Sequence, residues 1–227
     1  MKVLAFTGPH GAGKTTTGYS FEKKYNHLFG MKVSVAAPLK ELVCDIYTNH
    51  GFNLSLNHLN SLKIKEDLIN YRIVATKEDC ETINYKFGIP MDFLSERTEG
   101  LYLHSIRHAM QFLGTEVIRD YDELAHTKMF VGFIRLLEDT CETLDFVWVD
   151  DVNFPNEWEA LIKKHEVFLV YIDNDVDAPE NVVHASQSHR GFFKHRADLI
   201  LKKSKLLTNE DEQLDRIFKL MGPVHGS

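Results

Sequence analysis

A glycine-rich run near the N-terminus has the residue types and the spacing that bind phosphate groups. Residues 8–15, Gly-Pro-His-Gly-Ala-Gly-Lys-Thr, match the pattern G-x-x-x-x-G-K-[ST] at each fixed position. Because glycine has no Cβ, the backbone can fold around an anion and direct successive N–H groups at its oxygens. Lys14 is expected to reach the β- and γ-phosphates of a nucleotide, and the Thr15 hydroxyl is expected to ligate Mg²⁺. The run therefore predicts a site for ATP and Mg²⁺.

The segments on both sides of this run have the patterns of the strand and the helix that a phosphate-binding loop requires. Residues 3–6 are a short apolar run typical of a buried strand, and residues 16–25 have the pattern of a helix start. The helix N-terminus places a partial positive charge beside the loop. A chance match within an ordinary strand–turn–helix is the alternative. We assign nucleotide contacts to Gly8, His10, Gly11, Ala12, Gly13, Lys14, Thr15 and Thr16.

Two adjacent carboxylates that follow a later apolar run are the predicted metal and acceptor ligands. Asp150 and Asp151 come directly after residues 146–149, which have the pattern of a buried strand. The carboxyl ends of parallel strands meet at one edge of a sheet, where the loop is also expected. Asp151 is the first choice for the Mg²⁺ shell, directly or through water; Asp150 is the second choice and a contact to the phosphate acceptor. The alternative is that one of the pair only caps the following turn.

Three further side chains are predicted to bind the acceptor. Arg107 and Gln111 lie four residues apart in a helical pattern, so both project from one helix face. The arginine suits a phosphate and the glutamine a base edge, whereas an exposed surface pair is the alternative. Lys40 lies near the start of a helix expected to begin at Pro38, and its alternative is a solvated surface lysine.

One arginine is expected to close over the phosphates during transfer. Arg119 follows a turn expected at Gly114–Thr115 and is our first choice for this role. Arg135, Arg190 and Arg196 are the alternatives.

Several short motifs are similar, in order and spacing, to those of the bacteriophage deoxynucleoside monophosphate kinases, a family of adenylate-kinase-like P-loop kinases. Residues 107–116 match that family's Arg-x-x-x-Gln-x-x-Gly-Thr-acid motif. The other matching blocks are residues 8–15, 37–40, 150–157 and 184–187. The resemblance implies ATP-dependent conversion of a deoxynucleoside monophosphate (dNMP) to the diphosphate. In this interpretation the catalytic residues are Lys14, Asp151, Arg107 and Arg119.

Two departures from the family pattern lie on the acceptor side. Asn153 and Gln187 stand where family members have arginine and glutamate. An arginine can bind a phosphate with two charged hydrogen bonds, which asparagine cannot supply. The departures leave two alternatives open: a kinase that phosphorylates 5-hydroxymethyluracil within phage DNA, as a related group of phage enzymes does, and a nucleotide-binding regulatory protein without transfer activity.

Five apolar runs, separated by helical patterns, predict the fold that positions these residues. The expected strands are residues 3–6, 32–36, 146–149, 167–172 and 198–201. This alternation indicates an α/β fold, a P-loop NTPase-type three-layer sandwich around a five-stranded parallel sheet. Residues 38–135 have no parallel-strand pattern and are expected to form a helical acceptor-binding and lid insertion, with helices over 59–71 and 101–120. We expect one kinase domain over residues 1–227, ending in a helix over 211–221.

Composition limits the class of protein. The 227 residues carry a formal net charge of −7, which argues against an indiscriminate nucleic-acid binder, although DNA stays open as an acceptor. Three widely spaced cysteines are typical of reduced intracellular thiols. The absence of a long apolar run and of a signal-peptide pattern predicts no membrane contact and a cytoplasmic location, in the host cytoplasm if the protein is viral. The expected partners are ATP and a nucleotide acceptor, bound by a monomer or homodimer.

Overall fold

The computed structural model describes residues 1–176 and 189–223. The chain divides into two compact units, which we call unit 1 (Met1–Val35 and Phe130–Ser227) and unit 2 (Ala36–Met129). Each unit has its own buried apolar core. The bounds of unit 2 are close to those predicted for the insertion, and the description of the whole chain as a single kinase domain stays a prediction.

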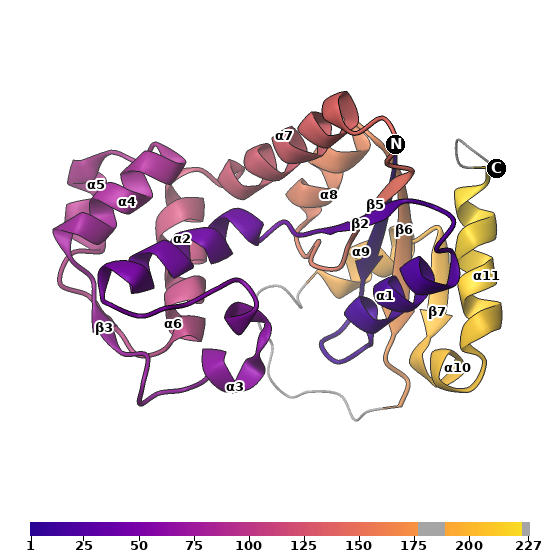
Figure 1. The fold of residues 1–227 in the computed structure, drawn as a ribbon, viewed down its shortest axis with the longest axis horizontal. Coiled ribbons are helices and arrows are strands. Elements are labelled where there is room, and N and C mark those ends of the chain that lie inside the picture. The colour runs from indigo at the N-terminus through magenta and orange to yellow at the C-terminus, as the bar shows by residue number, and fades with distance from the viewer. Residues whose placement is uncertain (177–188, 224–227) are drawn as a thin grey trace. The chain divides into compact units, whose positions relative to one another are not determined.

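Unit 1 is built on a five-stranded parallel sheet, as the apolar runs predict (Figure 1). Its strands are β1 (Lys2–Thr7), β2 (Gly30–Val33), β5 (Phe146–Val149), β6 (Glu166–Asp173) and β7 (Leu199–Lys202). They lie in the order β2-β5-β1-β6-β7, and every neighbouring pair is parallel. The strand that leads into the glycine-rich loop is therefore central, and the loops after β5, β1 and β6 meet at one edge of the sheet.

Helices cover both faces of this sheet. One layer contains α1 (Lys14–Lys24) and α11 (Glu210–Met221), and the other contains α8 (Pro155–Ile162), α9 (Arg190–Arg196) and the unit 1 part of α7 (Ala125–Thr140). Side chains of β1 alternate between the layers: Leu4 and Phe6 pack with α1 and α11, whereas Val3 and Ala5 pack with the other helices. This arrangement confirms the predicted three-layer α/β fold. A short helix, α10 (Lys203–Thr208), precedes α11.

The second strand lies earlier in the chain than predicted, whereas the other four begin and end within one residue of their predicted bounds. β2 pairs with β5 from Gly30, opposite Phe146, to Val33, opposite Val149. Beyond Val33 the Ser34 hydroxyl and the Val35 N–H both donate to the Asp151 carboxylate. The strand ends there because the chain bonds a side chain in place of the β5 backbone.

Unit 2 is mainly helical and contains a two-stranded antiparallel sheet. Its elements are α2 (Ala37–Asn49), the 3₁₀ turn η1 (His58–Asn60), α3 (Leu62–Lys65), β3 (Ile73–Val74), α4 (Lys77–Phe87), α5 (Met91–Arg97), β4 (Tyr102–Leu103), α6 (Ile106–Gln111) and η2 (Phe112–Arg119). Pro38 lies in the first turn of α2, as predicted, because that position needs no backbone N–H donor. Leu42, Ile46, Ile83 and Ile106 bring α2, α4 and α6 into one core.

The helix predicted over 59–71 is wrong. Only η1 and the short α3 form there, and the chain then turns at Asp67. The Asp67 carboxylate accepts hydrogen bonds from the backbone N–H groups of Ile69 (2.8 Å) and Asn70 (2.9 Å). This local bonding offers the backbone an alternative to the helix, which is the reason aspartate favours turns.

The helix predicted over 101–120 also needs correction. It begins only after β4, where the Ser105 hydroxyl accepts from the His108 N–H and caps α6. No turn forms at Gly114–Thr115, because the chain continues from α6 into η2, which is π-helical. A Cβ at Gly114 would lie 2.8 Å from Leu39 Cδ2, so this glycine permits close packing of η2 on α2. Among the helices that the structure describes, none is both long enough and apolar enough to cross a membrane.

Candidate active site

The glycine-rich loop joins β1 to α1 and requires glycine at several positions. Gly8, Gly11 and Gly13 have φ angles of 138°, 71° and 95°, which side chains with a Cβ rarely adopt. A Cβ at Gly8 would also lie 2.2 Å from the carbonyl oxygen of Ile172 in β6. The predicted strand, loop and helix are therefore present in order, with the glycines at the positions that need them.

Lys14, the first residue of α1, folds back over this loop. Its Nζ donates to the carbonyl oxygens of Gly8 (2.9 Å) and Pro9 (2.8 Å). Burial lowers the pKa of Lys14 to about 8; the charge of Asp150 opposes this shift, and that of Arg190 adds to it. An ammonium desolvated in this way gains from a bound anion, because the anion would restore the favourable interactions lost with water.

The other assigned loop residues differ in exposure. His10 and Thr16 are exposed, whereas Ala12 is buried and its N–H donates to the Pro9 carbonyl (3.3 Å). These positions agree with a loop whose backbone, more than its side chains, faces a ligand.

Thr15 contacts Asp150 rather than Asp151. The Thr15 hydroxyl donates to Asp150 Oδ2, and the same oxygen lies 2.8 Å from Lys32 Nζ. A hydroxyl and a carboxylate are oxygen donors of the kind that Mg²⁺ prefers, and Mg²⁺ is usually held by one or two such side chains together with waters and phosphates. Thr15 and Asp150 therefore fit a Mg²⁺ ion.

Asp151 bonds the end of β2. Its Oδ2 accepts from Ser34 Oγ (2.5 Å) and its Oδ1 accepts from the Val35 N–H (2.9 Å). Each of its carboxylate oxygens thus already accepts a hydrogen bond from the protein. Asp151 therefore bonds the loop after β2, whereas Asp150 contacts Thr15, and the choice between the two as the metal ligand stays a prediction.

Asn153 serves the backbone of the loop after β5. Its side-chain amide donates to the Asp151 carbonyl (2.9 Å), and its own N–H donates to Glu157 Oε2 (2.8 Å). The same Glu157 oxygen accepts from the Phe154 N–H (3.1 Å), so this buried carboxylate caps α8. The residue that replaces the arginine of the resembled family therefore has a local structural role. The related block at 184–187 lies outside the described residues.

Three of the arginines considered for the phosphates, Arg135, Arg190 and Arg196, belong to the same unit as the loop, and Arg190 acts on Lys14. Helix α9 crosses the edge of the sheet: the ring of His189, just before α9, lies 5.8 Å from that of Phe154, and Lys194 lies 2.7 Å from Asp173 at the end of β6. β1 lies between β5 and β6, so the start of α9 is beside the loop. The Arg190 charge acts on Lys14, and Arg190 Nε is buried with no hydrogen-bond partner among the described residues.

Three of the four predicted acceptor residues, Lys40, Arg107 and Gln111, belong to unit 2, whereas Asp150 belongs to unit 1. Arg107 in α6 forms an ion pair with Glu66, directly after α3, at 3.0 Å. Lys40 in α2 and Lys65 in α3 are half-buried, and the charges of Arg107 and Lys40 both act on Lys65. Gln111 is exposed at the end of α6. Within unit 2, Lys40 and Arg107 therefore both lie near Lys65, and their predicted role as acceptor ligands stays a prediction.

Arg119 lies at the end of η2, beside the buried His126. Burial, with a smaller contribution from the Arg119 charge, lowers the pKa of His126 to about 4. The ring packs against Phe87 with 5.7 Å between centroids. Within unit 2, Arg119 therefore borders a packed core residue, and its predicted role over the phosphates stays a prediction.

Acid is expected to destabilise the protein through His126. Histidine in an unfolded chain titrates near pH 6.5, so the stability of the buried neutral ring is complete above that pH and is lost as the pH falls toward 4. The loss amounts to up to about 3 kcal/mol. Urea unfolding between pH 7 and 4.5 measures it, and His126→Phe should remove most of this pH dependence. An equally steep profile in the variant would contradict the assignment.

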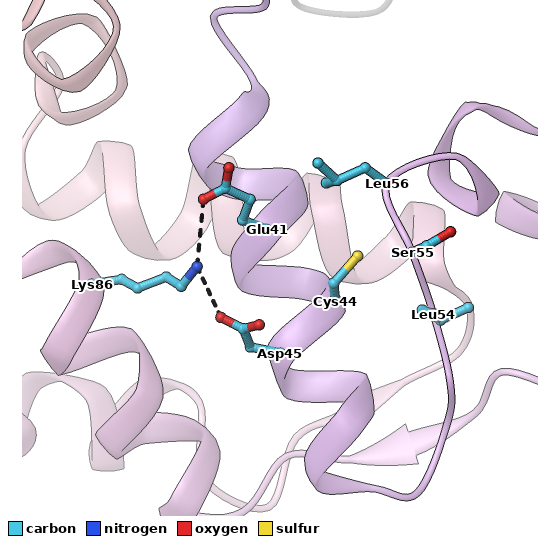
Figure 2. Close-up of a pocket in the computed structure, with 7 residues that line it drawn as sticks. All are labelled: Glu41, Cys44, Asp45, Leu54, Ser55, Leu56 and Lys86. Carbon is cyan, nitrogen blue, oxygen red and sulfur yellow. Dashed lines mark ion pairs between the residues drawn. The ribbon is translucent and has the colours of Figure 1, made fainter. Parts of the chain in front are cut away.

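Unit 2 also contains a hollow of about 380 Å³, which is not lined by Lys40, Lys65 or Arg107 (Figure 2). Lys86 there lies between two carboxylates of α2, 3.7 Å from Glu41 and 2.8 Å from Asp45. The Cys44 thiol lines the same hollow, and burial raises its pKa, which keeps it in the unreactive thiol form. Because the lysine is already neutralised by its neighbours, we do not assign a phosphate to this hollow.

The motifs did not identify three polar residues that the structure brings into these sites: Lys32, Ser34 and Lys65. Lys32 lies opposite Trp148 in the β2–β5 register, and its ammonium is 5.0 Å from the Trp148 ring centroid. An ionisable residue inside a strand pattern is the signal that could have indicated Lys32. Ser34 and Lys65 carry no such signal, because their partners are distant in sequence.

Comparisons with known proteins identify no family for this chain. No family model and no curated protein sequence matches it. Among solved structures, it is similar to a shikimate kinase from Bacteroides thetaiotaomicron, with 13% identity and a TM-score of 0.42 over 97% of this chain and 98% of that one. It is also similar to a dephospho-CoA kinase from Campylobacter jejuni, with 12% identity and a TM-score of 0.42 over the same shares of the two chains. Similarity at this level leaves the activity to be argued from the site itself.

Proposed function

We propose that the protein is an ATP-dependent kinase that converts a deoxynucleoside monophosphate to its diphosphate. The observation that carries the proposal is the grouping of Lys14, Thr15 and Asp150 at the end of the central strands. This grouping combines a buried ammonium for phosphate oxygens with two oxygen donors for Mg²⁺.

The site residues of unit 1 each have a defined role in this proposal. Phosphoryl transfer needs positioning and neutralisation of charge more than covalent help from the protein. The loop N–H groups and Lys14 hold the β- and γ-phosphates, while Thr15 and Asp150 hold Mg²⁺, which when bound neutralises charge on those phosphates. Lys32 fixes the Asp150 carboxylate through their ion pair. Arg190 is the arginine that we assign to the γ-phosphate.

The acceptor side of the proposal rests on unit 2. Arg107 and Lys40 bind the acceptor phosphate, and Gln111 binds the edge of its base. A group of cations favours an acceptor that carries a phosphate, which supports a nucleotide over a nucleoside. Asp150 is engaged by Thr15 and Lys32, so we assign it to the metal and not to the acceptor.

A transfer assay tests the proposal. The protein is incubated with γ-labelled ATP, Mg²⁺ and either a panel of dNMPs or duplex DNA containing 5-hydroxymethyluracil. We expect label on at least one dNMP and none on the matching deoxynucleosides. Label on the DNA alone would replace the proposed acceptor with the modified base, and label on neither acceptor would favour a nucleotide-binding regulatory protein.

A further inference from the structure

The ion pair between Arg107 and Glu66 is the starting point, because it is weak and its arginine is incompletely bonded. The two groups are 3.0 Å apart, but their side chains are 40% and 52% exposed. Exposed pairs of this kind contribute about 0–1 kcal/mol. Arg107 Nε is buried without a hydrogen-bond partner among the described residues. An unbonded buried N–H is costly, so this guanidinium gains from a second anionic partner.

Lys65, directly before Glu66 in the chain, lies near two other cations. The packing of α3 on α6, and of α2 on α6, brings Lys65 into the neighbourhood of Arg107 and Lys40. All three are half-buried, and neither lysine forms an ion pair with a residue that the structure describes. Burial, with the charges of Arg107 and Lys40, lowers the pKa of Lys65. Lys65 is thus repelled by the charges of Arg107 and Lys40, and the exposed carboxylate of Glu66 alone opposes them, so the group is short of negative charge.

We propose that Lys65 and Arg107 together bind the phosphate of the acceptor, and that Glu66 is an internal competitor displaced when that phosphate binds. The inference rests on the proposed function for the identity of the acceptor. A phosphate monoester carries close to two negative charges at neutral pH, against one for a carboxylate, and its oxygens also match the two-pronged geometry of a guanidinium. It can also neutralise Lys65 and Lys40, which Glu66 alone does not.

This arrangement gives the site a preference among phosphates. A phosphodiester carries one negative charge and has fewer free oxygens, so it competes less well with Glu66 for the guanidinium. Specificity of this kind comes from the competing carboxylate as well as from the attractive groups. The site formed by Lys40, Lys65 and Arg107 therefore selects a terminal phosphate monoester.

Paired variants of the full-length chain test the proposal by binding of dNMP in the absence of ATP. Lys65→Met removes the charge and keeps the apolar stem, and Lys63→Met is the matched control because Lys63 is an exposed lysine of the same short helix. We expect Lys65→Met to weaken dNMP binding on the order of tenfold, as for loss of a charge-assisted hydrogen bond, and to leave deoxynucleoside binding unchanged. Lys63→Met should match the wild type. Equal effects of the two variants would overturn the role of Lys65.

Glu66→Gln gives a prediction of opposite sign. Removal of the competing charge should tighten dNMP binding several-fold and leave ATP binding unchanged, with thermal unfolding confirming that each variant is folded. Weaker dNMP binding by Glu66→Gln would overturn the competitor role, because it would make Glu66 a ligand of the acceptor or a support of the fold.

A titration with inorganic phosphate separates this inference from the proposed function. The Lys65 side-chain signal, identified in NMR spectra of lysine-labelled protein by its loss in Lys65→Met, should shift with phosphate in the wild type and at lower phosphate concentration in Glu66→Gln. This result supports the phosphate site even if the transfer assay finds another acceptor. A Lys65 signal insensitive to phosphate would overturn the inference even if dNMP is the acceptor.

Discussion

Replacement of Lys14 by alanine is expected to lower kcat by about 10²–10³-fold or more and to leave the protein folded. Lys14 supplies a desolvated positive charge at the loop, and this charge is worth most as the transferring phosphate develops charge in the transition state. Stability should change little, because the loss of two hydrogen bonds to loop carbonyls is offset by removal of a buried ammonium whose pKa is lowered.

Steady-state kinetics with the acceptor identified by the transfer assay, together with thermal unfolding, provide the measurement. Lys23→Ala is the matched control, because Lys23 is an exposed lysine of the same helix. Arg190→Ala in the same assay should also lower kcat, whereas Arg196→Ala should not. A Lys14→Ala enzyme with the wild-type rate would refute the phosphate-loop assignment, and an unfolded one would make Lys14 a structural residue.

The fold was predictable because its signals are local. Four of the five strands coincide, within one residue at each end, with short apolar runs between helical patterns, and burial on both faces of a parallel sheet produces such runs. The loop was equally accessible, since Gly8 and Gly13 occupy backbone conformations that disfavour other residues. The start of α2 could be predicted from Pro38 for the same kind of reason.

The order of the two aspartates was accessible in principle but needs the alternation of side chains along β5. Phe146 and Trp148 pack on the α1 face, whereas Val147 and Val149 pack on the opposite face. Continuing this alternation places Asp150 on the face of α1, whose first turn contains Thr15. Proximity to a strand end does not distinguish adjacent residues, so the choice between Asp150 and Asp151 needs this alternation.

The acceptor side was less predictable because its contacts depend on tertiary packing. Lys65 is near Arg107 only because α3 packs on α6, and the pattern that predicted one helix over 59–71 missed the turn made by Asp67. Gly114 has a helical conformation that any residue can adopt, and its requirement for a small side chain comes from Leu39. Neither the proximity of Lys65 to Arg107 nor the need for a small side chain at position 114 can be predicted from the neighbouring residues in the sequence.

Asp150→Asn and Asp151→Asn are expected to differ sharply, and the comparison decides which carboxylate serves the metal. Asparagine keeps the shape of aspartate and removes its charge, so a loss at position 150 reports on charge beside Thr15. Asp150→Asn should raise the Mg²⁺ concentration needed for half-maximal activity and lower kcat by about 10²–10³-fold. The measurement is kcat against Mg²⁺ at a fixed ATP concentration.

Asp151→Asn should act mainly on the loop after β2. Its Oδ1 and Oδ2 accept from Val35 and Ser34, and an amide can replace only one of these acceptors without rearrangement. We therefore expect lower thermal stability and a loss of activity of about tenfold, the smaller effect typical of residues that orient a site, with an unchanged Mg²⁺ requirement. If Asp151→Asn instead shifted the Mg²⁺ requirement more than Asp150→Asn, the hydrogen bonds to Ser34 and Val35 would have to break when the metal binds. Asp151 would then be the ligand, and Thr15 and Asp150 would part on nucleotide binding.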